Sequence, residues 1–171
     1  MSLEIERKFL VIGDSWRNSA EPGQYLRQGY ISHAEQGSVR VRLAADRAWL
    51  TLKSGRAGIL RHEFEYDIPV AHAIEMLDRL CIGPIIEKTR YRVPHAGRLW
   101  EVDVFGGDAQ GLIIAEVELA SVHDEVIIPS WAGKEVTDDP RFRNSAITLI
   151  GAPLFAAYSA DFTPDLRDQP G

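Results

Sequence analysis

The chain has 171 residues, of which 45% are hydrophobic and 26% are charged, and its formal net charge is −6 at pH 7. These proportions are typical of a soluble globular protein, and the negative charge argues against nonspecific binding of nucleic acid or of an anionic membrane. The single cysteine, Cys81, excludes an internal disulfide framework, and no stretch approaches the roughly 18 apolar residues that span a bilayer. With no signal-peptide pattern at the N-terminus, we expect a cytoplasmic protein without nucleic-acid or membrane partners.

Eight segments alternate polar and apolar residues with the period of a β-strand. They span residues 4–10, 24–32, 38–44, 48–53, 60–68, 85–93, 99–105 and 112–120. A turn leads into a short helix near residues 13–17. Apolar residues at helical spacing predict a helix over 71–81, which Gly83-Pro84 ends. Asp138-Asp139-Pro140 is a typical helix start and predicts a second helix from about 141 to 150.

One face of these strands carries most of the charge, and the opposite face is aliphatic or aromatic. The first strand shows the pattern, because Glu4, Glu6 and Lys8 share a face. The whole set comprises Glu4, Glu6, Lys8, Arg40, Arg42, Lys53, Glu63, Glu65, Lys88, Arg90, Arg92, Glu101, Asp103, Glu116 and Glu118. An amphipathic sheet with a solvated charged face is the ordinary interpretation of such a pattern.

Two features favour a closed barrel over an open sheet. The charges come in same-sign pairs two residues apart, such as Arg40/Arg42 and Glu116/Glu118, and such neighbours repel each other. Eight antiparallel strands can also close, which removes the sheet edges. The predicted fold class is therefore α+β: an eight-stranded antiparallel β-barrel that forms a charged tunnel, with helices packed on the outside.

A tunnel lined by acids and bases has a chemical interpretation. Pairs of carboxylates supply the hard oxygen ligands that Mg²⁺ and Mn²⁺ prefer. Arginine and lysine bind phosphate oxygens. The combination indicates a polyanion that a divalent metal bridges to the protein.

The segment Glu4-Ile5-Glu6-Arg7-Lys8 resembles the N-terminal Glu-x-Glu-x-Lys signature of the CYTH family, the triphosphate tunnel metalloenzymes. The resemblance covers residues 3 to 150 approximately and extends through Arg40-x-Arg42, Lys53, Glu63-x-Glu65, Lys88-x-Arg90, Glu101-x-Asp103 and Glu116-x-Glu118. It implies a single CYTH-like domain over 1–171, strand-rich over 3–120, with a C-terminal helical region at about 131–152 and a flexible tail at about 160–171. Within the family, the chain looks most like the short bacterial inorganic triphosphatases.

The resemblance also implies roles for individual residues. The metal ligands would be Glu116, Glu118 and Asp103, with Glu4 and Glu6. The catalytic groups would be Glu4, Glu6, Lys8, Glu63 and Glu65. The triphosphate would be held by Lys8, Arg40, Arg42, Lys53, Lys88, Arg90 and Lys134, the last from a loop that helps to close one tunnel mouth. Water would attack a terminal phosphoryl group in line, with Mg²⁺ or Mn²⁺ as cofactor.

Several alternatives stay open at the level of sequence. Thiamine triphosphatase and adenylyl cyclase are activities of the same family, and a non-catalytic polyphosphate- or nucleotide-binding module belongs to another class. Any of the carboxylates could serve only to neutralise a neighbouring base. Arg92 is an extra base that the resemblance does not account for. The oligomeric state is also open, with a homodimer among the alternatives.

Overall fold

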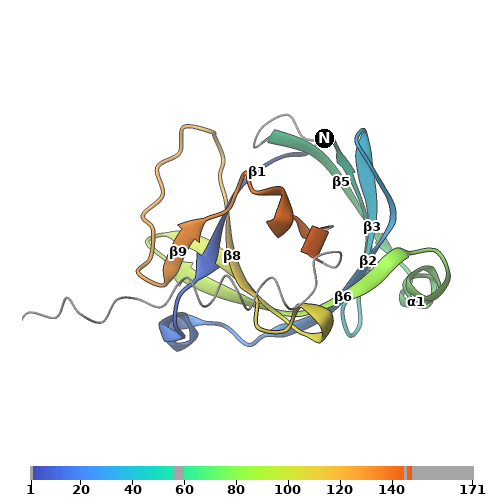
Figure 1. Ribbon diagram of the computed structural model, residues 1–171, viewed down its shortest axis with the longest axis horizontal. Coiled ribbons are helices and arrows are strands. Elements are labelled where there is room, and N and C mark those ends of the chain that lie inside the picture. The colour runs from blue at the N-terminus through green and yellow to red at the C-terminus, as the bar shows by residue number, and fades with distance from the viewer. Residues whose placement is uncertain (1, 56–59, 145, 148–171) are drawn as a thin grey trace, which may run out of the picture.

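The computed structural model describes residues 2–55, 60–144 and 146–147, and it forms a closed barrel of antiparallel strands (Figure 1). The strands are β1 (Ser2–Val11), β2 (Gln24–Ala34), β3 (Gly37–Leu43), β4 (Ala48–Ser54), β5 (Leu60–Ile68), β6 (Ile82–His95), β7 (Arg98–Phe105), β8 (Ile113–Glu118) and β9 (Ala132–Glu135). The helical elements are α1 (Val70–Arg79) and three short 3₁₀ turns, η1 (Ser15–Ser19), η2 (Gly107–Ala109) and η3 (Pro140–Phe142).

Strand β1 closes the barrel because it pairs with two different neighbours. Its first half, up to Ile5, is antiparallel to β5, and its second half, from Glu6 to Leu10, is antiparallel to β8. The order around the sheet is β5-β4-β3-β2-β6-β7-β8-β1, with β9 added to β1 and with β5 returning to β1. The closed eight-stranded antiparallel barrel of the sequence prediction is confirmed.

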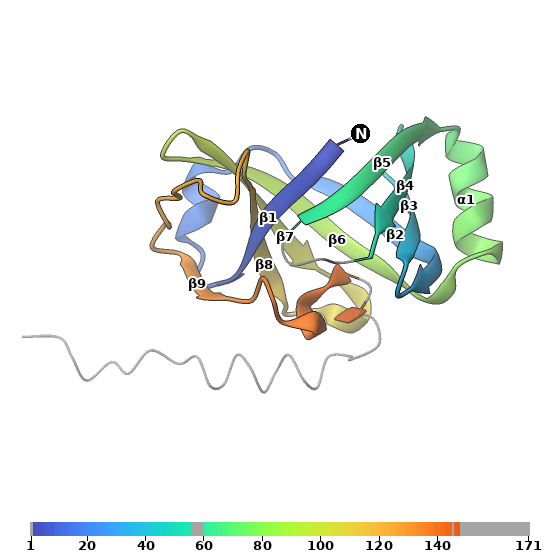
Figure 2. The same cartoon turned by 90° about the horizontal axis from the view of Figure 1, so that it is seen from above.

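The apolar faces of the strands point outward and are covered in two places. Helix α1 covers β3, where its Ala73 and Leu77 pack with Val41. On the other side, Val102 and Val117 are buried in one cluster with Trp16 of η1 and Trp131. Figure 2 shows α1 on the outside of the barrel, beside β3. The charged face is therefore turned inward. Within the described ranges, no helix has both the length and the hydropathy of a bilayer-crossing segment.

At one end of the barrel the inner face changes from charged to apolar. Leu10, Phe105, Ile86 and Ile114 each lie two residues away from a charged inward residue on their own strand, so they share its face. These four side chains pack together with Phe142 and Ile147 of the C-terminal segment. Figure 1 shows η3 inside the ring of strands. The described C-terminal residues around Phe142 and Ile147 therefore fill part of one end of the barrel.

Two expectations about the C-terminal region need correction. Lys134 was predicted in a loop, but it lies in β9, because Arg7 donates two hydrogen bonds to Glu135 and the Val136 N–H donates to the Lys8 carbonyl at 2.8 Å. The predicted helix 141–150 does not begin at 141: the turn η3 ends at Phe142, and Arg143 is extended before helical residues reappear at 144. The remainder of that prediction, at residue 145 and from residue 148 onward, lies outside the described residues.

The orientation of the two faces gives a test by substitution. Val117 is 1% exposed in the outer apolar layer, so Val117→Asp should lower the free energy of unfolding by about 3 kcal/mol or more. Its neighbour Glu118 points inward among other acids, so Glu118→Gln should leave the unfolding free energy equal or higher. Thermal melting in the presence of a chelator measures both. Melting of Val117→Asp like the wild type would show that the faces have been assigned the wrong way round.

Candidate functional site

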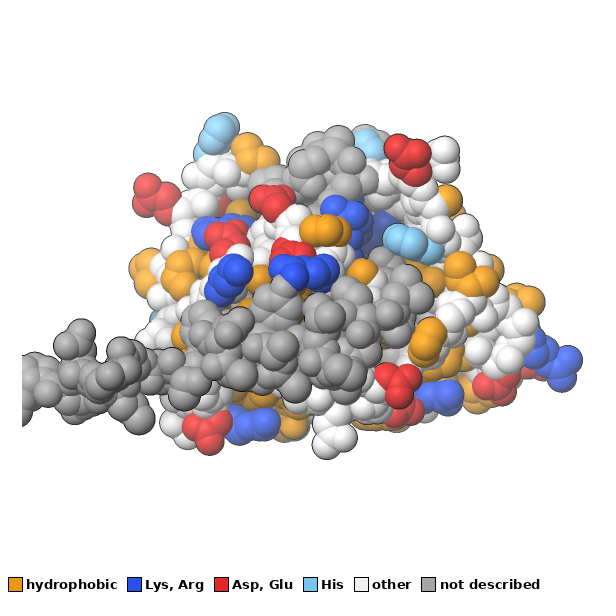
Figure 3. Space-filling model, in the orientation of Figure 1, with side chains coloured by type: hydrophobic (Ala, Val, Ile, Leu, Met, Phe, Trp, Pro, Cys, Tyr) orange, Lys and Arg blue, Asp and Glu red, His pale blue; other side chains and the backbone are white. Residues whose placement is uncertain are grey.

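A cavity of about 570 Å³ lies inside the barrel, and charged side chains from seven of its strands line it. The lining residues are Glu4, Glu6, Lys8, Tyr30, His33, Ser38, Arg40, Arg42, Lys53, Arg61, Glu63, Glu65, Arg90, Gly97, Arg98, Leu99, Glu101, Glu116, Glu118, Arg143 and Asn144. Basic and acidic side chains also lie next to one another on the face seen in Figure 3. Most of the residues predicted from the strand alternation therefore converge on a single cavity.

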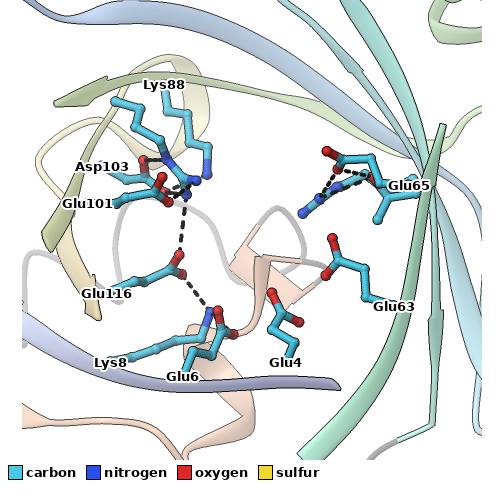
Figure 4. Close-up of polar contacts among 12 residues, drawn as sticks. Glu4, Glu6, Lys8, Glu63, Glu65, Lys88, Glu101, Asp103 and Glu116 are labelled. Carbon is cyan, nitrogen blue, oxygen red and sulfur yellow. Dashed lines mark hydrogen bonds and ion pairs between the residues drawn. The ribbon is translucent and has the colours of Figure 1, made fainter. Parts of the chain in front are cut away.

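Arg90 organises the charges on the β7–β8 side of the cavity. Its Nε and Nη2 donate to the two oxygens of Asp103, both at 2.7 Å, and it also contacts Glu101 and Glu116. Lys88 donates to Asp103 at 2.5 Å, and Lys8 donates to Glu116 at 2.6 Å. Figure 4 shows this group gathered on one side of the barrel. The chain of ion pairs fixes the inward side chains of β1, β6, β7 and β8 relative to one another.

These pairs keep the buried acids ionised. Burial disfavours the charged form of Glu116, but the charges of Lys8 and Arg90 outweigh this effect and hold its pKa well below the usual value. The pKa of Asp103 is lowered for the same reason, since Arg90 and Lys88 outweigh its burial. Burial and the adjacent Arg90 lower the pKa of Lys88 to about 7, against the attraction of Asp103.

A second group of ion pairs lies on the opposite wall, where β1 meets β5. Lys53 contacts Glu4 at 2.6 Å and Glu63 at 2.7 Å. The Arg40 guanidinium donates to the Thr51 hydroxyl at 3.2 Å and lies 3.8 Å from Glu65. In Figure 4, Glu4, Glu63 and Glu65 lie across the cavity from Asp103 and Glu101. The acids on this wall are therefore also partly neutralised by neighbouring bases.

Two places in the cavity carry charge that the described residues do not neutralise. Glu118 forms no ion pair with any of them, and its pKa is raised by burial and by the charges of Glu4 and Glu101. Arg42 likewise forms no ion pair within the described chain, and burial, with Arg40 and Arg90, lowers its pKa to about 10. An excess of negative charge at one point and of positive charge at another is the arrangement expected of a site that binds a cation and an anion together.

Three predicted site residues do not line the cavity. Lys88 and Asp103 are each 1% exposed and lie behind its wall, where they support Arg90. Lys134 is exposed on β9 and is not among the lining residues, so the structure does not place it at a tunnel mouth. Arg92, which the resemblance left unexplained, is largely exposed and lies 3.8 Å from Glu21.

The cavity also contains residues that the sequence analysis did not select. Arg61 lies two residues before Glu63 on the inward face of β5. The alternation that selected Glu63 and Glu65 therefore also predicts Arg61, when it is followed two residues further toward the start of the strand. Arg143 and Asn144 come from a segment without strand periodicity, and no signal in the sequence places them in the barrel. Gln28 of β2 is not a lining residue: it is fully buried, and neither its amide oxygen nor its amide nitrogen has a hydrogen-bond partner in the described part of the chain.

The donor set of the described residues suits a divalent cation, although it forms no ready-made site. Among the described residues, no three Asp, Glu, His or Cys side chains converge as metal ligands, because lysines and arginines hold several of the acids in ion pairs. Glu118 is free of such a pair and lies with Glu4, Glu6 and Glu101 along the cavity. Carboxylate oxygens are the ligands that Mg²⁺ and Mn²⁺ prefer, so the residues fit this class of ion.

Comparison with known proteins agrees with this geometry. A family model described as the CYTH domain matches residues 2–149. The chain is 48% identical over 145 residues to an inorganic triphosphatase of Acetivibrio thermocellus, covering 85% of this chain and 92% of that protein. It is 39% identical over 151 residues to an inorganic triphosphatase of Nitrosomonas europaea, covering 85% and 97%. The crystal structure of an inorganic triphosphatase matches with a TM-score of 0.60 at 38% identity, covering 85% of this chain and 97% of that one.

The unpaired positive charge of Arg42 predicts a measurable anion affinity. Arg42→Gln should weaken the binding of inorganic triphosphate at least tenfold, because a charge-assisted hydrogen bond contributes about 1.5–3 kcal/mol. Isothermal titration calorimetry measures the affinity. Arg47→Gln is the matched control, since Arg47 is exposed and pairs with Asp67 away from the cavity, and it should bind like the wild type. Equal affinities for all three proteins would contradict the assignment of Arg42 to the anion site.

Proposed function

The chain belongs to the CYTH domain family, and on this premise we propose that it hydrolyses inorganic triphosphate to diphosphate and phosphate with a bound divalent cation. The two relatives above, both named inorganic triphosphatases, are similar over more than nine tenths of their own length, which supports this substrate. The observation in the structure that carries the proposal is the cavity with its two sites of unneutralised charge, one at Glu118 and one at Arg42.

We place the cation at the acids around Glu118. Glu116, Glu118 and Asp103, with Glu4 and Glu6, were expected as ligands, and we assign Glu118 first because it has no basic partner in the described chain. Glu6 is its direct neighbour across the β1–β8 pairing, although it also contacts Lys8 at 2.9 Å. Asp103 and Glu116 lie in ion pairs with Arg90, so they act as supports that position it. When bound, Mg²⁺ or Mn²⁺ would be held by Glu118 and the acids near it, and it would supply positive charge against the negative charge that develops during hydrolysis.

We place the triphosphate across the cavity, against the bases. Arg40 and Arg42 project from β3 on the inward face and are the least neutralised of the predicted phosphate ligands. Three other predicted ligands are already paired with carboxylates: Lys8, Lys53 and Arg90. They would attract the triphosphate through their positive charge without giving up these ion pairs. Lys88 acts from behind the wall through Asp103. Guanidinium groups match the geometry of phosphate oxygens, which explains the predominance of arginine here.

We assign the positioning of the attacking water to the acids on the wall where β1 meets β5. Glu63 and Glu65 of β5 accompany Glu4 and Glu6 of β1 along the cavity, and Lys53 holds two of these four carboxylates in place. An ionised carboxylate accepts a hydrogen bond from water and can orient it toward the terminal phosphorus. The proton released from that water would pass to one of these oxygens.

We also assign the reaction to the cytoplasm. Cys81 is the single cysteine of the chain, and its thiol is free and partly buried, as expected in a reducing compartment.

A panel of phosphate-release assays tests the substrate. Inorganic triphosphate, thiamine triphosphate, ATP and long-chain polyphosphate are each incubated with Mg²⁺, Mn²⁺ or chelator. We expect inorganic triphosphate to be hydrolysed with the highest kcat/KM and chelator to abolish turnover. Preference for thiamine triphosphate or ATP would move the chain to another branch of the family, and binding without turnover of any compound would indicate a non-catalytic module.

Glu118 gives the sharpest test of the metal assignment, because its replacement leaves no buried base unpaired. Glu118→Gln should lower kcat at least tenfold and shift the metal concentration for half-maximal activity upward, with the melting temperature unchanged or raised. Glu75→Gln on the exposed face of α1 is the control and should behave like the wild type. Glu116→Gln is less informative, since it also removes a carboxylate partner from the buried bases Lys8 and Arg90. Full activity of Glu118→Gln at low metal concentration would sink the assignment.

A further inference from the structure

The C-terminal segment contributes a base to the cavity from a direction that no strand can use. The strands surround the cavity as its walls, whereas η3 lies inside the ring of strands (Figure 1). Phe142 and Ile147 are buried in the apolar cluster at this end of the barrel. Arg143 and Asn144, between them in the sequence, line the cavity instead. Arg143 therefore reaches the cavity from one end of the barrel, whereas the residues on the strands reach the cavity from its sides.

The backbone of Arg143 is held in place by its neighbours. Its N–H donates to the Pro140 carbonyl at 3.4 Å, and its own carbonyl accepts from the N–H groups of Ala146 at 2.8 Å and Ile147 at 3.0 Å. Buried side chains on either side, Phe142 at 2% exposure and Ile147 at 0%, anchor the segment in the barrel. The guanidinium is thus presented from a fixed point.

The guanidinium of Arg143 has no protein partner in the described part of the chain. Its Nε is buried without a hydrogen bond, and the ion pairs of the described residues do not include it. Arg141, two residues earlier, differs in each respect: it bonds to Asp139 through Nε and Nη2, is 41% exposed and does not line the cavity. Arg143 is partly buried, and a buried Nε without a hydrogen-bond acceptor is costly unless a ligand supplies one.

We propose that Arg143 binds the free terminal phosphate of the substrate and so selects linear polyphosphates that enter the barrel end first, an inference that rests on the proposed function. An end phosphate is the part of a linear triphosphate that meets a group placed at the end of the cavity. It also carries more charge than an internal phosphate, with a second pKa near 6, and exposes three oxygens to the planar fork of an arginine. A cyclic triphosphate has the same phosphate units but no end.

Steady-state kinetics on four proteins test the proposal: wild type, Arg143→Gln, Arg143→Lys and Arg141→Gln. With linear triphosphate, Arg143→Gln should raise KM about tenfold or more and change kcat less than threefold, as expected for lost substrate binding. Arg143→Lys should recover part of the affinity, because it keeps the charge but not the fork. Arg141→Gln should match the wild type, and thermal melting checks that all four proteins are folded.

Cyclic triphosphate, used as a competitive inhibitor, separates recognition of the end from general attraction. Its inhibition constant should be the same within twofold for wild type and Arg143→Gln, and failure of the ring to bind either protein also supports the requirement for an end. A KM for Arg143→Gln within twofold of the wild-type value overturns the proposal, as does a parallel loss for linear and cyclic compounds. If the wild type does not hydrolyse triphosphate, the proposed function fails, and calorimetric affinities of the same four proteins for linear triphosphate still decide the role of Arg143.

Discussion

The structure depends on a single constraint: charged side chains that are turned into a barrel must be neutralised inside it. Lys8, Lys88, Asp103 and Glu116 are each less than a tenth exposed, and burying such groups without partners would cost more than the fold could supply. Arg90 resolves most of this problem on one wall, because it contacts three carboxylates at once. Together with the Lys8–Glu116 pair, these contacts link four strands around the cavity, so the ion pairs serve the architecture as well as the chemistry.

The network is nevertheless incomplete, and its incomplete places coincide with the proposed binding sites. Glu118 carries negative charge without a basic partner in the described chain, and Arg42 carries positive charge without an acidic one. Pairing every charge would have given a stiffer protein with no affinity for a metal and a polyanion. Burial and neighbouring like charges raise the pKa of Glu118 and lower that of Arg42, so both shifts disfavour the charged form. A bound ligand of opposite charge would favour the charged form of each group.

The order of the barrel also explains why the outer surface is not the functional one. The apolar faces of β3, β7 and β8 are covered by α1, Trp16 and Trp131, whose packing stabilises the sheet from outside. The usual arrangement of a small domain, with an apolar centre and a charged surface, is therefore inverted within the barrel. The apolar cluster around Phe142 is the exception, and it places the C-terminal segment across one end of the cavity.

The period of two in the strands was sufficient to predict most of the lining, because alternation assigns each side chain to a face without any knowledge of the partner strand. Glu4, Arg40, Glu63, Glu101 and Glu118 were all found in this way. Their roles in catalysis stay predictions. The closed barrel needed two further features of the sequence, the same-sign charge pairs and the number of strands. Tertiary structure alone decided which charges are paired, since that depends on register between strands distant in the chain. Lys88 and Asp103 pair behind the wall, while Arg42 lines the cavity without an ion pair in the described chain. Tertiary structure also decided the position of Lys134, which backbone pairing with β1 draws into β9, and of Arg143, whose place follows from the burial of Phe142 and Ile147 on either side. A segment without periodicity takes its position from the surfaces against which it packs, and these exist only once the barrel has closed.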